Sequence, residues 1–169
     1  ARHLTGHYCV PATLGALAKA VPERAQAESV PLWAQVVSGT KEDNRRFAVE
    51  FVLSGALGGL INKDGLSVIS FPTNTAATSV EVLENETTLI VEKKQIRTDS
   101  EGAGKYRGGR GLQMDFRATS EEAVRYSPLC DRIEHPAQGV QGGHAGDPGK
   151  LLLDGTPLHS KRSIFLRKG

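Results

Sequence analysis

Two short runs of sequence decide the fold: LWAQVV at residues 32–37 and FAVEFVL at residues 47–53. In both runs apolar side chains recur at every second position, which is typical of a half-buried β-strand. Residues 38–45, between the runs, contain Gly39 and several charged side chains, as a turn does. The two runs therefore predict a β-hairpin.

One helix is expected before this hairpin. A single apolar stripe recurs at helical spacing and consists of Val10, Leu14, Leu17, Ala18 and Val21. Pro11 suits the first turn of such a helix, and Pro22 would end it. The spacing predicts a helix over residues 10–21.

The rest of the chain alternates between short apolar runs and polar or glycine-rich segments. Glycines at positions 55, 58 and 59 predict a bend or a close approach of backbones. Further strands are predicted at Val80–Leu83, Thr87–Arg97, Leu112–Arg117, Ala123–Leu129, Leu151–Leu153 and Ile164–Leu166. Loops are predicted at Thr73–Ser79, Thr98–Gly111 and Gly139–Gly149. The predicted fold class is α+β and predominantly β, with one N-terminal helix and short, mostly antiparallel strands joined by long glycine-rich loops.

Composition excludes several classes of protein. With 38% hydrophobic and 24% charged residues, the 169-residue chain is globular in composition rather than disordered. A net charge of +2 is too small to indicate nucleic-acid binding. The longest uncharged apolar run, residues 51–61, is shorter than the roughly 20 residues of a membrane span. The first seven residues lack the apolar run of a secretory signal.

Two cysteines, Cys9 and Cys130, are too few for a disulfide framework. Free thiols in a domain of this size fit a reducing compartment, so the expected localisation is cytoplasmic. A single disulfide between them is the less favoured alternative.

Two motifs resemble known sites incompletely. His3 and His7 have the spacing of a zinc-binding helix, but the glutamate of H-E-x-x-H is missing and Gly6 disfavours a helix there. Two partly exposed histidines near a chain end are the simpler interpretation. Thr98–Gly111 contains Gly-Lys as phosphate loops do, and arginines around Tyr106 as RNA-binding segments do. Asp99 and Tyr106 break the phosphate-loop pattern, and a structured turn between two strands is favoured.

Cys130, Asp131, Arg132 and His135 bring four reactive side chains together within six residues. Such a group is suited to bind a substrate carboxylate, or to form a Cys–His pair in which the cysteine is the nucleophile. A structural ion pair between Asp131 and Arg132 that holds the next loop explains the residues at least as well.

The loop Thr73–Ser79 offers an amide and several hydroxyls, with Asn74 and Thr75 near its start. These groups suit a polar, amide-like ligand. Turn formation alone would explain them equally well, so both interpretations stay open.

Several stretches, taken in order, resemble the hydantoinase B/oxoprolinase family. They are ARHLTGHY (1–8), GALAKAVP (15–22), NKDGLSVISFPTNT (62–75), SVEVLE (79–84), LIVEKKQIRTDSEGAGKYRGGRG (89–111) and CDRIEHPAQGVQGGHAGDPG (130–149). The last of these is similar to the family's late pattern of D-R, P, G, G-G and G-x-P-G. Nearly the whole chain is covered, and Val80–Gly111 is the most specific part.

The resemblance implies a protein that opens cyclic amides, such as hydantoins or 5-oxoproline, together with a hydantoinase A-like ATP-binding partner in an oligomeric complex. It implies ATP and a divalent metal as cofactors of the complete complex, with none in the present chain. The substrate-binding residues expected here are Asn74, Thr75, Asp131, Arg132 and His135. Relatives that carboxylate acetone or acetophenone provide one alternative activity, and a non-catalytic scaffold provides another.

Family chains are several times longer than this one. Their metal motif, H-L-x-D, is absent, since His3-Leu4 continues with Thr5-Gly6. We therefore expect residues 1–169 to be a single domain, a fragment of the C-terminal half of a hydantoinase B-like protein, and inactive when isolated.

Overall fold

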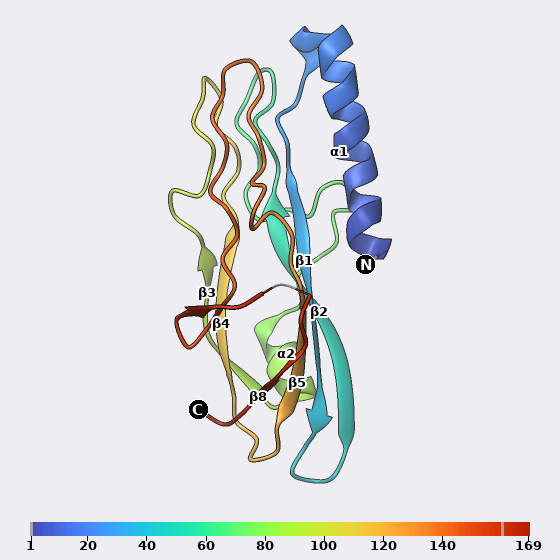
Figure 1. The fold of residues 1–169 in the computed structure, drawn as a ribbon, viewed down its shortest axis with the longest axis vertical. Helices are drawn as coiled ribbons and strands as arrows, with labels where there is room; N and C mark the ends of the chain where they lie inside the picture. Colours follow the sequence, from blue (N-terminus) through green and yellow to red (C-terminus); the bar gives the residue numbers. More distant parts are fainter. Residues whose placement is uncertain (1, 160) are drawn as a thin grey trace.

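The hairpin predicted from residues 32–53 is present in the computed structural model, which describes residues 2–159 and 161–169 (Figure 1). Strand β1 (Val30–Thr40) pairs antiparallel with β2 (Arg46–Ala56) in a register in which Val37 lies opposite Val49. The turn closes where the backbone N–H of Lys41 donates to the carbonyl of Arg45. Each strand is longer than the alternating run that predicted it.

Two further strands complete the main sheet. Its order is β2-β1-β5-β8, with β5 at Val124–Leu129 and β8 at Ile164–Leu166, and all of its pairings are antiparallel. A second sheet pairs β3 (Leu89–Ile96) with β4 (Leu112–Ala118), and a small hairpin pairs β6 (Leu152–Leu153) with β7 (Thr156–Pro157). The α+β, predominantly β fold class is confirmed, and β7 is a strand that sequence patterns did not predict.

The main core lies between the two sheets. Phe116 of β4 packs edge-to-face against Phe51 and Tyr126 of the main sheet, with ring centroids 5.9 and 5.5 Å apart. Val37 is fully buried in the same cluster. On the opposite face of β1, Leu4 of helix α1 packs against Leu32 and Ala34. Strand β1 is therefore buried on both faces.

Helix α1 spans Arg2–Ala20, so it begins well before the predicted start and holds Pro11 in its interior. Leu4 and His7 are buried in its first turns, and packing on the sheet overrides the unfavourable Gly6 and Pro11. The predicted stripe is not the buried face, because Val10 and Leu17 are exposed. A short 3₁₀ turn, η1 (Pro22–Arg24), follows the helix.

The strand predicted at Val80–Leu83 is wrong: these residues begin helix α2 (Val80–Glu86). The Ser79 hydroxyl caps the helix by accepting a hydrogen bond from the Val82 N–H. Leu83 is the buried residue of this helix and enters the main core. Val80 and Val82 have the alternating spacing of a strand, which led to the wrong prediction. The Ser79 cap and the burial of Leu83 favour a helix instead.

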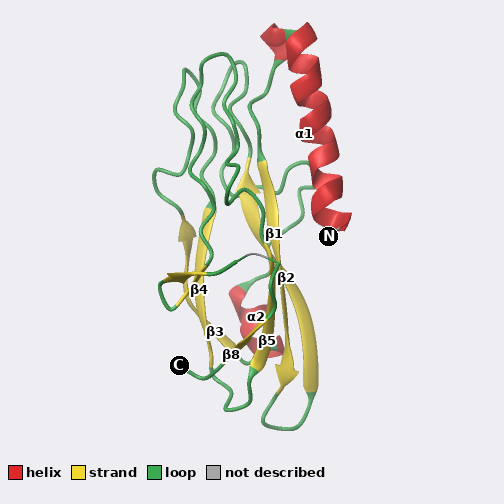
Figure 2. Cartoon of the chain, viewed as in Figure 1, coloured by secondary structure: helices red, strands yellow, loops and turns green. Residues whose placement is uncertain are grey.

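Long loops gather beyond the strands at one end of the molecule (Figure 2). The predicted loops Thr98–Gly111 and Gly139–Gly149 are confirmed and run beside the segment that follows β2. Backbone hydrogen bonds join neighbouring loops, from Gly65 to Arg107, from Gly109 to Leu57 and from His144 to Ala103. The loops pack so closely that a Cβ atom at Gly65 would lie 2.0 Å from the Leu57 carbonyl oxygen.

We expect Gly65→Ala to lower the free energy of unfolding by about 1–3 kcal/mol or more, because the added methyl group meets backbone that cannot move aside. The matched control is Gly111→Ala, whose Cβ would meet nothing within 4 Å. The control should leave stability unchanged or raise it by about 0.4–1 kcal/mol. Chemical denaturation measures both, and equal effects of the two substitutions would contradict the close packing.

Candidate functional site

Arg132 lies where helix α1, the segment before β1 and a glycine-rich loop meet. Its Nη1 donates to Glu28 Oε2 at 2.8 Å, and its guanidinium lies 5.1 Å from the centre of the Tyr8 ring. Glu28 also accepts from the backbone N–H of Gln138 at 3.1 Å. The side chain of Arg132 is only 14% exposed, so one cation ties three segments together in a partly desolvated place.

The electrostatics of this group follow from burial. Desolvation raises the pKa of the Tyr8 hydroxyl, and the positive charge of Arg132 opposes that rise. The Arg132 Nε is buried and has no hydrogen-bond partner among the described residues. Its backbone has φ 61°, in the left-handed region that a non-glycine residue adopts only when its surroundings fix it. These features mark Arg132 as held tightly in one orientation.

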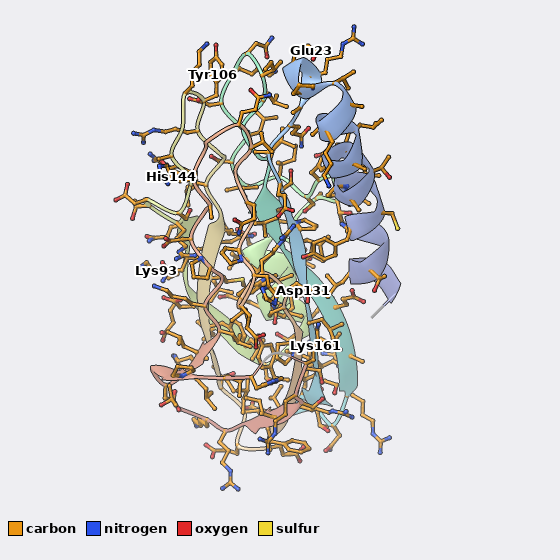
Figure 3. The ribbon with its side chains drawn as sticks, turned by 45° about the horizontal axis from the view of Figure 1, so that its top comes forward. Glu23, Lys93, Tyr106, Asp131, His144 and Lys161 are labelled. Atoms are coloured by element: carbon orange, nitrogen blue, oxygen red, sulfur yellow. The ribbon has the colours of Figure 1, made fainter. Side chains whose placement is uncertain are left out.

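Asp131 has different partners. Its carboxylate lies 2.9 Å from the Lys161 ammonium, and its carbonyl accepts the indole N–H of Trp33 at 2.8 Å. Figure 3 shows Asp131 and Lys161 as neighbours in the middle of the molecule. The structural ion pair expected between Asp131 and Arg132 is therefore wrong, because each of them pairs with a residue distant in sequence.

His135 contributes backbone rather than side chain to this place. Its carbonyl lies 3.5 Å from the Arg132 Nη1, and the residue itself is exposed. The structure thus brings Asp131, Arg132 and His135 together, as their spacing requires, but what they bind stays a prediction. Sequence reasoning missed the partners Tyr8, Glu28, Gln138 and Lys161. No local pattern could connect residues as distant as Glu28 and Arg132, which are 104 positions apart.

Cys130 belongs to the core. Its sulfur accepts from Gln35 Nε2 at 3.4 Å, and the amide oxygen of Gln35 accepts the hydroxyl proton of Tyr126. Burial raises the pKa of the Cys130 thiol to about 12, so the thiol is neutral at physiological pH. A nucleophilic thiolate paired with His135 is therefore disfavoured. Cys9 is exposed on α1, and both cysteines are free, as expected.

Asn74 and Thr75 lie in an exposed loop. Asn74 has φ 53° and donates its N–H to the carbonyl of Ser70, and the Thr75 hydroxyl lies 3.0 Å from that of Thr73. Within residues 2–159 and 161–169, these contacts stay inside the loop and do not reach Arg132. Asn74 is thus presented to solvent on a turn, and its role in binding stays a prediction.

The loop Thr98–Gly111 is fixed by an internal ion pair. Glu101, whose side chain is 5% exposed, accepts from Arg110 through both oxygens and from Arg107. The hydrogen bond from Arg110 lowers the pKa of the Glu101 carboxyl. The Lys105 ammonium lies 5.5 Å from the Tyr106 ring centre. A structured loop is confirmed, and strand β4 follows it rather than the helix of a phosphate loop.

A cavity of about 310 Å³ lies among the loops at this end, lined by glycines of several loops together with larger residues such as Glu28, Tyr106, Gln138 and His144. Tyr106 and His144 lie at this end in Figure 3. Of the His3–His7 pair, the side chain of His3 lies outside the described residues, and His7 is buried rather than partly exposed. In the described part of the chain, no group of three or more His, Cys, Asp or Glu side chains is placed to hold a metal ion. No helix there is long and apolar enough to cross a membrane.

The whole chain, residues 1–169, matches the family described as Hydantoinase B/oxoprolinase. The chain belongs to the hydantoinase B/oxoprolinase family. It is 36% identical over 99 residues to a 5-oxoprolinase of Pestalotiopsis fici, in a match that covers 58% of this chain and 8% of that protein. It is 27% identical over 156 residues to a putative D-/L-hydantoinase component of a Pseudomonas species, in a match that covers 90% of this chain and 26% of that protein.

A solved structure has the same fold. A nucleotide-free acetone carboxylase superposes with a TM-score of 0.59 at 22% identity, over 74% of this chain and 17% of that one. The present hydantoinase B-family chain therefore spans about a quarter or less of the length of these relatives.

Glu28→Gln should lower the free energy of unfolding by about 1–3 kcal/mol, because it removes the charge from two hydrogen bonds in a partly desolvated place. The control is Glu92→Gln, since Glu92 is 55% exposed and pairs with an exposed Arg117 at 2.9 Å. The control should change stability by less than about 1 kcal/mol. Urea denaturation measures both, and a smaller effect at Glu28 than at Glu92 would contradict the assigned role.

One thiol should react with an aromatic disulfide reagent in the folded protein at mildly alkaline pH, and both should react in denaturant, since only Cys9 is exposed. Burial raises the pKa of Cys130 from 9.0 to about 12 in the folded protein. The neutral thiol therefore stabilises the folded state fully at pH values below the unfolded pKa, and this stabilisation is lost as the pH rises through the folded pKa. Fast reaction of both thiols in the native protein would show that Cys130 is accessible.

Proposed function

We propose that this chain is one part of a protein that opens cyclic amides by ATP-dependent C–N hydrolysis, working with an ATP-binding partner. The observation that carries the proposal is the family match over all 169 residues. The names of the relatives, 5-oxoprolinase and putative D-/L-hydantoinase, support a five-membered cyclic amide as substrate.

The described residues support a role in binding and positioning. Cys130 is a neutral, buried thiol, and both Asp131 and Arg132 are held in ion pairs. In contrast, Asn74 and Thr75 present an amide and a hydroxyl from an exposed turn. Asn74 and Thr75 would bind the ring amide, while Arg132 would keep the glycine-rich loops in place around the substrate.

ATP and the divalent metal of the complete complex would bind outside the residues described. The glycine-rich loop before β4 does not lead into a helix, and Lys105 lies against Tyr106. The described part of the chain offers no cluster of metal ligands. Both observations favour the partner, or other parts of a longer chain, as the source of these groups.

A carboxylase activity is the second candidate, favoured by the fold shared with acetone carboxylase. A scaffold without catalytic groups is the third, and exposed apolar side chains such as Leu17 (51% exposed) and Phe165 (69%) are consistent with contacts to other parts of a complex. The substrate dependence of ATP turnover separates the first two, and the effect of removing this chain tests the third.

In the complete complex, Asn74→Ala should lower kcat/KM for a hydantoin or 5-oxoproline about tenfold, the cost of one hydrogen bond to the ring. Arg132→Lys should lower it too, because lysine cannot reproduce the geometry of the guanidinium. Asn85→Ala, at an exposed residue of α2, and Arg117→Lys, at an exposed residue of β4, are matched controls at residues not assigned to the site. ATP hydrolysis coupled to ring opening is the measurement.

Unchanged kinetics in both site variants would overturn the assignment of these residues. ATP turnover that requires bicarbonate and a ketone would instead identify a carboxylase. A complex that stays active when both site residues are replaced, but no longer assembles without residues 1–169, would establish the scaffold.

A further inference from the structure

The glycine-rich segment of residues 132–149 begins and ends at one point of the structure. The backbone N–H of Gly149 donates to the carbonyl of Arg132 at 2.9 Å, so the two ends of the segment are joined directly. The middle of the segment reaches the neighbouring loops, for example where the His144 N–H donates to the Ala103 carbonyl at 2.8 Å. The direction in which the segment leaves the main sheet is therefore set where Arg132 and Gly149 meet.

Trp33 of β1 contacts both ends of this segment. Its indole N–H donates to the carbonyl of Asp131 at 2.8 Å, and Figure 3 shows Asp131 in the middle of the molecule. The six-membered ring of the indole lies against Gly149, because a Cβ atom added at that glycine would be 2.3 Å from Trp33 Cζ2. One side chain thus contacts the residue that precedes the segment and the residue that closes it.

These contacts hold the backbone of Arg132 from both sides. Peptide groups are planar, so the orientations of the two groups that flank a residue determine its φ and ψ. The group before Arg132 contains the Asp131 carbonyl, which Trp33 binds, and the group after it contains the Arg132 carbonyl, which Gly149 binds. The clamp accounts for the φ of 61° at Arg132, a value that a non-glycine residue keeps only where its surroundings impose it.

Trp33 lies on a rigid support. Strand β1 is paired on both sides, with β2 and with β5. Gln35, two residues further along and on the same face of β1, donates to Cys130 Sγ at 3.4 Å. The strand therefore holds Cys130 through one side chain and Asp131 through another, directly before Arg132.

The position of the Arg132 guanidinium depends on this backbone. The guanidinium donates to Glu28 at 2.8 Å, and Glu28 also accepts the backbone N–H of Gln138 at 3.1 Å. A turn of the Arg132 backbone would move the guanidinium away from Glu28 and loosen the hold of Glu28 on Gln138. A change at Trp33 would thus reach Gln138 through Arg132 and Glu28.

We propose that Trp33 is a positioning residue, which keeps the backbone of Arg132 in the left-handed conformation and thereby directs the guanidinium to Glu28. The contacts concerned lie between residues of this chain, so they need no uncovered surface in a longer protein. The consequence for activity rests on the proposed function, in which Arg132 keeps the glycine-rich loops around the substrate.

Hydrogen exchange of the full-length protein, measured by mass spectrometry on peptides that contain Gln138, tests this role without reference to activity. Trp33→Phe keeps an aromatic ring but loses the N–H donor, so exchange at Gln138 should become about fivefold faster, the effect of one hydrogen bond. Gly149→Ala displaces the indole ring and should have a similar effect. Arg132→Ala should also accelerate exchange, and the double variant Trp33→Phe/Arg132→Ala should exchange no faster than Arg132→Ala alone.

Two matched controls separate this effect from a general loosening of the loops. Ser67→Ala removes a hydroxyl that accepts the Arg110 N–H at 2.9 Å in a neighbouring loop, and Gly111→Ala adds a Cβ atom that meets nothing within 4 Å. Both should leave exchange at Gln138 unchanged. Acceleration by either control equal to that of Trp33→Phe would overturn the proposal, and so would equal acceleration across β5, since Trp33 would then hold the whole sheet.

Unchanged exchange at Gln138 in Trp33→Phe would overturn the positioning role directly. Additive acceleration in the double variant would overturn it too, because Trp33 would then act independently of Arg132.

The same variants in the complete complex connect the role to activity. Trp33→Phe should lower kcat/KM for a hydantoin or 5-oxoproline about fivefold, and the double variant should match Arg132→Ala. Additive losses in kcat/KM would contradict an action through Arg132. A wild-type complex that opens neither ring would refute the proposed function alone, since the exchange measurements decide the role of Trp33 without it.

Discussion

The pairing of β1 between β2 and β5 is the constraint on which the rest of the structure depends. Because β1 is buried on both faces, it lies between two hydrophobic clusters. Val37 faces the core under the second sheet, and Leu32 and Ala34 face helix α1. A shift of one residue in register would turn Val37 toward the α1 side and Leu32 and Ala34 toward the main core, so the apolar side chains of both clusters would be misplaced. The position of α1, and with it of Tyr8, follows from this pairing.

The loop end depends on a different kind of contact. The backbones of neighbouring loops lie too close together there for side chains to fit between them. The loops are held instead by hydrogen bonds between glycine-rich segments and by two carboxylates, Glu28 and Glu101. Each carboxylate holds an arginine and thereby fixes a loop. A rigid loop end of this kind is suited to shape a binding site, whereas the one buried thiol nearby is not activated for covalent chemistry. These features support the positioning role that we propose for the chain.

Membership of the hydantoinase B/oxoprolinase family could be expected from sequence because its motifs lie in continuous runs, above all residues 89–111 and 130–149. The site was only partly predictable. Asp131, Arg132 and His135 are neighbours in sequence, and the structure keeps them together. Their partners are not local, so the pairing of Arg132 with Glu28 had no signal in the sequence, and a pair between adjacent residues was wrongly expected.

The sequence by itself determined the hairpin, the strands β3–β5 and the glycine-rich loops, because period-two patterns and turn residues act over short distances. It did not determine the start of α1 or the nature of α2. At both places tertiary contacts outweigh local preference: Leu4 packs against β1, His7 is buried, and Leu83 enters the core. Only the tertiary structure decided that Cys130 is an inert core residue and that β2 stands first in the strand order of the main sheet, since burial and strand order depend on segments far apart in the chain.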